Sequence, residues 1–253
     1  MTLSPYAKPG FYEDALAKGR HRDIVGGRWE ETGDTVIPLL FDLGLRRSDR
    51  FLDIGAGALR LGCRIIPELP PGHYWATDAS GALMRRGWEV ELTPDQQARL
   101  PLDQLIEDAE FRFPGVPTDI DFALCFAVFT HLPLSSLRQG LAGVRARFPA
   151  LRRLLFTVFL ATDEAAFAAP YRQRDGVVTH PDRTPWHHLA GDVVATAVMP
   201  TDRQPSSADN TISPGAGAVF SPKRCSGSST MVTRTPRMVT STSTCGPSPS
   251  TAR

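Results

Sequence analysis

The sequence predicts an α/β fold with a doubly wound, mostly parallel sheet. Short apolar runs that suit buried strands alternate with segments whose apolar residues recur at helical spacing. This alternation favours parallel strands, because each connecting helix returns the chain to the end of the sheet from which it started. The chain has 253 residues, of which 42% are apolar, and this is enough for one domain with a sizeable core.

Five segments have the pattern of buried strands, and several of them end in an acidic residue. The expected strands cover 50–54, 73–77, a short stretch near 105–106, 120–128 and 153–160. The second is followed directly by Asp78 and the third by Asp108. In an open α/β sheet, ligands bind beyond the carboxyl ends of the strands, so these ends are the first place to look for a site.

Helices are expected between the strands. The clearest covers 134–148, where apolar residues step by three and four positions along the chain. Further helices are expected over 11–18 and 30–43, after the first strand around 59–66, after Ser80, which can cap a helix, and over 189–198.

The composition divides the chain into three parts. Residues 1–48 are expected to form a helical segment that packs on the core, and 49–200 to form a Rossmann-like domain. In 201–253, 30 of 53 residues are Ser, Thr, Pro or Gly, and only one is aromatic. Six basic and two acidic residues give this tail a charge of +4; since the whole chain carries +1, residues 1–200 carry −3. Such a tail buries too little apolar surface to offset chain entropy, which predicts disorder.

The first expected strand ends in the motif Asp53-Ile54-Gly55-Ala56-Gly57, directly before a helix. Glycines at 55 and 57 let the backbone turn sharply and approach a ligand with no Cβ in the way. Asp78 follows 25 residues after Asp53, at the end of the next strand, where a carboxylate can accept both hydroxyl hydrogens of a ribose. Together these features indicate a ligand that contains a nucleoside.

Two positions decide which nucleoside is favoured. The dinucleotide fingerprint G-x-G-x-x-G requires a glycine at position 60, where this chain has Arg60. Asp53, two residues before the first glycine, would repel a pyrophosphate and suits a ligand with an ammonium group. S-adenosylmethionine has an amino-acid end, a sulfonium and no phosphate, so the charges favour it over NAD.

At this point the chain resembles the class I S-adenosylmethionine-dependent methyltransferases, over roughly residues 20–190. The resemblance rests on the Asp53–Gly57 loop, on Asp78, on segments 25–30 and 71–74, and on Val128-Phe129-Thr130-His131-Leu132-Pro133. It implies that Gly55 and Gly57, with Ala56 between them, pack on the methionine part of the cofactor. It also implies that Asp78 holds the ribose, that Asp108 holds the adenine amino group, and that segment 126–128, beginning with Phe126, lines the pocket beside the sulfonium.

The implied function is methyl transfer from S-adenosylmethionine to a small molecule or a cell-surface precursor. A catalytically silent protein that keeps the binding site is the alternative, and an NAD-dependent oxidoreductase is disfavoured by Arg60. A nucleic-acid substrate is not expected, because residues 1–200 carry −3 without an interleaved basic and aromatic stretch. The expected location is the cytoplasm, without a membrane partner, because the longest apolar run is too short to span one.

No catalytic residue can be assigned from the sequence, since the sulfonium already activates the methyl group and alignment does most of the work. His131 is either a general base or a structural residue that caps the following helix. Arg60 either contacts the cofactor carboxylate or faces solvent, and Trp29 either closes over the cofactor or packs on the sheet. No metal site is expected: the four cysteines are scattered, and His180, His187 and His188 suit a solvated loop.

The last expectation concerns the end of the sheet. Folds of the resembled family finish with two further strands, one of them antiparallel, whereas residues 201–253 show no alternating apolar pattern. The sheet is therefore expected to lack its last two strands. Arginine outnumbers lysine by 25 to 3, which suggests a GC-rich gene, in which shifted frames commonly stay open. This supports the hypothesis that the reading frame is lost near residues 195–201, and that activity is impaired.

Overall fold

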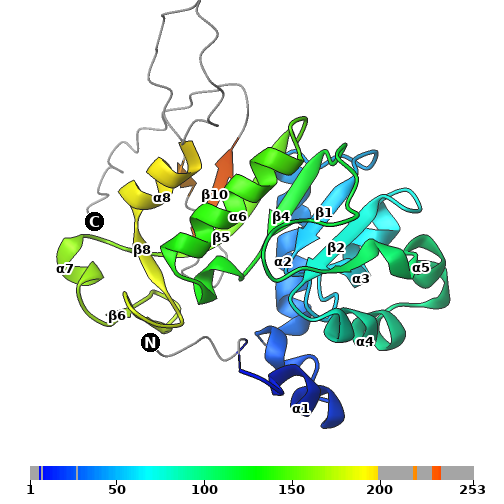
Figure 1. Cartoon of the computed structure of the whole chain (residues 1–253), viewed down its shortest axis with the longest axis horizontal. Helices are drawn as coiled ribbons and strands as arrows, with labels where there is room; N and C mark the ends of the chain where they lie inside the picture. The colour runs from blue at the N-terminus through cyan, green and yellow to red at the C-terminus, as the bar shows by residue number, and fades with distance from the viewer. Residues whose placement is uncertain (1–5, 7, 27, 199–218, 221–229, 235–253) are drawn as a thin grey trace, which may run out of the picture.

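The computed structural model describes residues 6, 8–26, 28–198, 219–220 and 230–234. Five parallel strands form the centre of the sheet, in the order β3-β2-β1-β4-β5 (Figure 1). These strands are β1 (Phe51–Ile54), β2 (Tyr74–Asp78), β3 (Leu105–Glu107), β4 (Phe122–Cys125) and β5 (Arg153–Ala161). The predicted α/β, Rossmann-like and mostly parallel architecture is confirmed, and each strand overlaps the segment expected for it.

Helices cover both faces of this sheet. They are α1 (Phe11–Ala17), α2 (Trp29–Asp42), α3 (Gly62–Ile65), α4 (Gly81–Glu91), α5 (Pro94–Arg99), α6 (Leu134–Arg147), α7 (Glu164–Phe167) and α8 (Ala190–Val198). Short 3-10 turns occur at η2 (Asp23–Val25), η3 (Ile66–Glu68), η4 (Leu102–Gln104) and η5 (Phe129–His131). The Ser80 hydroxyl caps α4 as expected, because it accepts a hydrogen bond from the backbone N–H of Leu83 at 3.2 Å. Among the described residues, no helix is long and apolar enough to cross a membrane.

Alternate residues of the strands point to opposite faces and form two apolar cores. Phe51 packs with side chains of α2, α3 and α4 on one face. Leu52 and Ile54 pack with α6 and α8 on the other, and Figure 1 shows α6 and α2 on opposite sides of the sheet. Since a strand has a side-chain period of two, a strand buried on both faces is apolar throughout. Asp53 is the exception in β1, and its place at the carboxyl end marks the site.

The chain between β5 and α8 forms a small subdomain at the carboxyl end of the sheet, the end at which Asp53 lies. A hairpin of β6 (Tyr171–Arg172) and β7 (Val178–Thr179) precedes β8 (His187–Leu189), which pairs in parallel with the last residues of β5. His187 and His188 are 0% and 3% exposed, so the expectation that they lie in a solvated loop is wrong. His187 is buried because both of its ring nitrogens have partners, the Thr179 hydroxyl at 2.8 Å and the Phe167 carbonyl at 3.0 Å.

Two strands follow in the C-terminal part of the chain. β10 (Thr230–Arg234) pairs antiparallel with β5, and β9 (Val219–Phe220) pairs antiparallel with β10. The expectation that the sheet lacks its last two strands therefore differs from the structure. An exposed edge of β5 offers unpaired backbone groups that an extended segment can bind, even without alternating apolar residues. The rest of 201–253, with the expected disorder and the frameshift hypothesis, lies outside the described residues.

Candidate functional site

A cavity of about 520 Å³ lies at the carboxyl ends of β1, β2, β4 and β5. Its volume is within the range of small-molecule and cofactor sites. The structure brings all seven sequence-predicted binding residues to its wall: Asp53, Gly55, Ala56, Gly57, Asp78, Asp108 and Phe126. These residues come from four separate strand ends, and only the parallel order of the strands places them together. Their individual roles remain predictions.

The turn after β1 depends on glycine. Gly55 and Gly57 have φ angles of +77° and +58°, which side chains other than glycine adopt only at a cost. The space around them is also closed, because a Cβ on Gly55 would overlap Cγ2 of Val128. A Cβ on Gly57 would lie 2.6 Å from Cγ1 of Val25. Both glycines line the cavity, and the backbone angles and the neighbouring valine side chains together require glycine at these two positions.

Asp78 ties the ends of β1 and β2 together. Its carboxylate accepts hydrogen bonds from the backbone N–H of Gly57 at 2.8 Å and of Ser80 at 2.9 Å. Burial raises its pKa, and these backbone donors oppose that rise. The backbone of Ala79 also contributes a hydrogen bond to this carboxylate, so of its roughly four acceptor sites about one remains for a donor from a ligand. Asp78 can thus accept a hydroxyl group while it holds the glycine turn in place.

Asp53 is almost fully buried, with 2% of its surface exposed. It accepts a hydrogen bond from the Tyr74 hydroxyl at 2.8 Å. Burial raises the pKa of Asp53 to about 7, an effect that this hydrogen bond reduces. A buried carboxyl group at the cavity wall is suited to a cationic ligand group, which would favour its ionised form.

Arg60 forms part of the same wall. The residue is 8% exposed, and its guanidinium carbon lies 5.7 Å from the centroid of the Phe126 ring. Burial lowers the pKa of Arg60, whereas nearby Asp53 raises it. Of the two alternatives left open by the sequence, the structure therefore excludes a solvent-facing side chain for Arg60.

Asp108 follows β3 and contacts the neighbouring strand end, because its backbone N–H donates to the Asp78 carbonyl at 2.8 Å. Its two carboxylate oxygens accept from the backbone N–H groups of Glu110, at 3.0 Å, and Phe113, at 2.7 Å. Asp108 thus shapes the loop after β3 and still presents a carboxylate to the cavity.

The turn after β4 adopts an unusual backbone without glycine. Ala127 has a φ of +60° and lines the cavity, and its N–H donates to the buried Thr157 hydroxyl at 2.7 Å. Leu59, which follows the glycine turn, has a φ of +61° and is completely buried. Strained residues of this kind persist where surrounding contacts hold them, and they cluster at functional sites. The sequence placed segment 126–128 at the pocket, but nothing in it indicated the positive φ of Ala127 or of Leu59.

His131, in η5 directly after this turn, also lines the cavity. Its Nδ1 lies 3.1 Å from the Thr184 hydroxyl, and burial lowers its pKa, so the imidazole is neutral near pH 7. The N-terminus of α6 has no side-chain cap, so the expected capping role of His131 is wrong. A neutral imidazole in a cavity can accept a proton.

The remaining wall comes from the subdomain after β5. Phe159 at the end of β5, together with Val177 and Pro185, gives it an apolar surface. A backbone hydrogen bond from Trp186 to the Thr130 carbonyl, at 2.7 Å, fixes this wall against η5. These residues could not be predicted from the sequence, because none of them belongs to a motif. The pairing of β8 with β5 and the contact with η5 bring them to the cavity.

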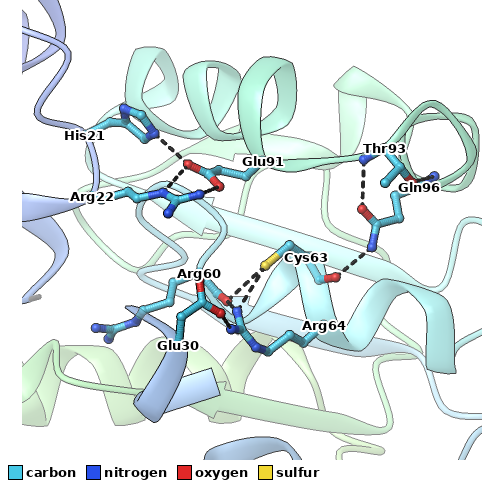
Figure 2. Close-up of polar contacts among 9 residues, drawn as sticks. All are labelled: His21, Arg22, Glu30, Arg60, Cys63, Arg64, Glu91, Thr93 and Gln96. Atoms are coloured by element: carbon cyan, nitrogen blue, oxygen red, sulfur yellow. Dashed lines mark hydrogen bonds and ion pairs between the residues drawn. The ribbon is translucent and has the colours of Figure 1, made fainter. Parts of the chain in front are cut away.

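The N-terminal segment closes the cavity on another side through Tyr6, Tyr12, Ile24 and Val25. Figure 2 shows how it is fastened: His21 and Arg22 both contact the Glu91 carboxylate at the end of α4, at 2.7 Å and 2.5 Å. Glu91 has only 5% of its side chain exposed, and although burial raises its pKa, the bonds from Arg22 and His21 lower it.

Trp29, at the start of α2, lies close to this fastening. It packs against Ala58 and Leu83 in a small apolar cluster, and the Arg22 guanidinium lies 4.8 Å from its ring centroid. Trp29 is not among the lining residues, and it packs against Ala58 and α4 instead of on the sheet, so the structure differs from both of its alternatives. Among the described residues, no group of His, Cys, Asp and Glu is arranged to hold a metal ion.

No protein-family model matches this chain, and no curated protein matches it either. Among solved structures, magnesium protoporphyrin IX methyltransferase from Synechocystis PCC 6803 with bound SAH is similar, with a TM-score of 0.53 and 14% identity. The match covers 88% of this chain and 94% of that one. The chain shares the fold of this methyltransferase.

Two further similar structures are more distant in shape. The same Synechocystis enzyme with bound SAM has a TM-score of 0.47 and 15% identity, over 90% of this chain and 84% of that one. An S-adenosylmethionine-dependent methyltransferase from Clostridium acetobutylicum has a TM-score of 0.43 and 14% identity, over 63% and 62%. At these identities the likeness concerns the fold, so any function must be argued from the site.

Proposed function

We propose that this chain is an S-adenosylmethionine-dependent methyltransferase, which acts on a small molecule or a cell-surface precursor. One observation carries the proposal: the glycine turn after β1 is hydrogen-bonded to Asp78 at the wall of a cofactor-sized cavity. In this proposal residues 49–200 form the cofactor-binding unit, and the segment before residue 49 closes over it.

The charges of the cavity fit this ligand. Four aspartates line it, Asp53, Asp78, Asp108 and Asp175, whereas its arginines are Arg28 and Arg60. A ligand with an ammonium, a sulfonium and a single carboxylate matches that balance better than a pyrophosphate does. Gly55, Ala56 and Gly57 would contact the methionine part, Asp78 the ribose and Asp108 the adenine, with Phe126 beside the sulfonium.

When bound, the cofactor supplies a methyl group already activated by its sulfonium. The chain then has to align the acceptor and exclude water, which the apolar wall of Phe159, Val177 and Pro185 can do. Where the acceptor is a hydroxyl or an ammonium group, its proton must also leave. Neutral His131, at the cavity wall, is the group placed to accept that proton.

Calorimetry with SAM and SAH tests the binding step. We expect the protein to bind both, and Asp78→Asn to bind SAH about 10-fold more weakly or worse, because one acceptor becomes a donor. Asp95→Asn, an exposed residue of α5, is the matched control and should leave binding unchanged. No binding at millimolar concentrations to folded protein would refute the proposal.

A second measurement separates the enzyme from a catalytically silent binding protein. SAH formation is followed with the protein, SAM and a panel of hydroxyl, amine and carboxylate acceptors. Turnover with any acceptor that is reduced in His131→Asn supports the enzyme. Tight SAM binding without turnover across the whole panel favours the silent alternative.

A further inference from the structure

We propose that Thr184 is a positioning residue for the transfer reaction: its hydroxyl accepts the Nδ1–H of His131 and so keeps the Nε2 lone pair at the cavity. This assignment rests on the proposed function and extends it to the segment between β7 and β8. Thr184 is not among the residues that line the cavity, so it acts through His131 and not on a ligand.

The two ring nitrogens of His131 have different surroundings. Nδ1 lies 3.1 Å from the Thr184 hydroxyl. Among the described residues nothing bonds Nε2, and this atom is not fully buried, so it is open at the cavity that His131 lines. The ring of Tyr6 packs edge-on against the imidazole, with the two centroids 5.0 Å apart. The imidazole is therefore held at one nitrogen and presents the other to a ligand.

The direction of the hydrogen bond between Thr184 and His131 decides what Nε2 can do. A hydroxyl group can donate or accept, so the contact fits either neutral tautomer of the imidazole. Once Nε2 has accepted a proton, both ring nitrogens carry hydrogen, and the hydroxyl can then only accept from Nδ1. A hydroxyl that accepts beforehand keeps its bond through the step, whereas one that donates must first rotate. The tautomer with hydrogen on Nδ1 is thus the one in which Thr184 assists proton acceptance.

The proton accepted by His131 comes from the acceptor molecule. As the acceptor atom bonds the methyl carbon, the electron pair of the broken carbon–sulfur bond stays on sulfur, and the acceptor's proton goes to Nε2. Burial disfavours the imidazolium that results, since it lowers the pKa of His131. The hydrogen bond from Nδ1–H to Thr184 becomes charge-assisted at that moment and offsets part of this cost.

Thr184 belongs to a segment that is fixed against η5 at two further positions. The N–H of Trp186 donates to the Thr130 carbonyl at 2.7 Å. The buried ring of His188 hydrogen-bonds backbone groups at both ends of the turn. The hydroxyl of Thr184 therefore approaches His131 from a support that is attached to the same turn, as precise orientation of a base requires.

Nitrogen-15 NMR of the imidazole rings tests the assignment without any acceptor. The full chain, labelled at histidine, is studied at about pH 8, where His131 is neutral and long-range proton–nitrogen spectra distinguish the two tautomers. Loss of one set of signals in His131→Asn identifies this ring among the six histidines. We expect hydrogen on Nδ1 in the unchanged protein and in Thr184→Ser, and a shift of that hydrogen to Nε2 in Thr184→Val.

Thr162→Val is the matched control, because Thr162 is an exposed threonine of the same subdomain whose hydroxyl bonds Asp163. It should leave the His131 signals unchanged. Hydrogen on Nε2 in the unchanged protein would overturn the assignment, and this observation needs no variant to fold. An unchanged tautomer in folded Thr184→Val would overturn it as well.

Kinetics adds a second readout with any acceptor that is turned over. Thr184→Val should lower kcat about 10- to 100-fold and leave the KM for SAM within about 2-fold, whereas Thr184→Ser should restore most of kcat. Equal kcat in Thr184→Val and the unchanged protein would overturn the assignment and leave the proposed function standing. Absence of SAM binding would refute the proposed function, and the role of Thr184 with it, whichever tautomer is found.

Discussion

The turns that follow β1 and β4 lie side by side at the cavity, yet they are built in opposite ways. After β1 the chain uses glycines at positive φ, and the unusual backbone there costs little. After β4 the same kind of backbone occurs at Ala127, where it costs about 1–2 kcal/mol. The hydrogen bond from Ala127 to the buried Thr157 hydroxyl holds that conformation.

The two turns also depend on each other. The side chain of Val128, next to Ala127, occupies the space that a Cβ on Gly55 would need. Gly55 therefore leaves space for Val128 at the end of the neighbouring strand, in addition to its expected contact with a ligand.

Gly55→Ala should be the most damaging change. Its backbone cost of about 1–2 kcal/mol adds to an overlap with Val128 that costs about 1–3 kcal/mol. Chemical denaturation should therefore show a loss of about 2–5 kcal/mol in the free energy of unfolding. Gly10→Ala is the matched control, because Gly10 has a φ of +78° with open space around it. Equal losses in both variants would show that the contact with Val128 is unimportant.

Asp53→Asn should remove the part of the pH dependence of the free energy of unfolding that comes from Asp53 in β1. Because the pKa of Asp53 is raised to about 7, the folded protein holds a proton there that the unfolded chain releases near pH 4. The stability contributed by this proton is present below about pH 4 and is lost as the pH rises to about 7. Relative to the unchanged protein, Asp53→Asn should gain about 2–4 kcal/mol between pH 5 and pH 8.

Urea unfolding at both pH values measures this gain. Asp78, whose pKa is also raised by burial, is present in both proteins; because its charge also raises the pKa of Asp53, the difference measures Asp53 together with its coupling to Asp78. The same change with pH in the two proteins would assign the pH dependence to another group.

Thr157→Val tests the support of the β4 turn. The change leaves the N–H of Ala127 without its partner at a site where Thr157 is 2% exposed, which should cost about 1–3 kcal/mol. Thr157→Ser keeps the hydroxyl and loses one methyl group, so it should keep the Ala127 conformation. If valine proves no worse than serine in thermal unfolding, the hydrogen bond does not hold the turn.

Ala127→Gly should give the smallest effect and the opposite sign. Relief of the positive φ is partly offset by the greater freedom of glycine in the unfolded chain, which leaves a gain of up to about 1 kcal/mol. Ala82→Gly, at an exposed position in α4, should instead lose about 0.5–1 kcal/mol. A loss in both variants would mean that Ala127 is not strained.

The side of the site that contains β1 could be predicted from the sequence, because its information is local. Apolar periodicity located β1 and α6 to within one residue at each end, and the Asp53–Gly57 motif located the turn between strand and helix. Asp78 was expected near that turn because it ends the next strand, and the structure joins it to Gly57.

The other side could not be predicted, because its residues are brought together only by the tertiary fold. Thr157 on β5 accepts a hydrogen bond from Ala127, which follows the neighbouring strand β4. His187 is buried with hydrogen-bond partners at Phe167 and Thr179. A polar residue in such a network has the same local pattern as one in a solvated loop, which is why His187 was misplaced. β10 was missed for the same reason, since its position depends on the edge of β5.

The fastening of the N-terminal segment to Glu91 has a consequence for kinetics. The segment forms a wall of the cavity, and it is joined to α4 by contacts that can break without disturbing the sheet. Arg22 remains half exposed, so salt weakens its ion pair with Glu91. If this segment opens more often at high salt, a nucleoside both enters and leaves the cavity faster. We therefore expect a rise in ionic strength to shorten the residence time of a bound nucleoside more than it changes the equilibrium affinity. For the proposed methyltransferase, we therefore expect the release of the demethylated product to become faster as salt weakens the contact between residues 21–22 and Glu91.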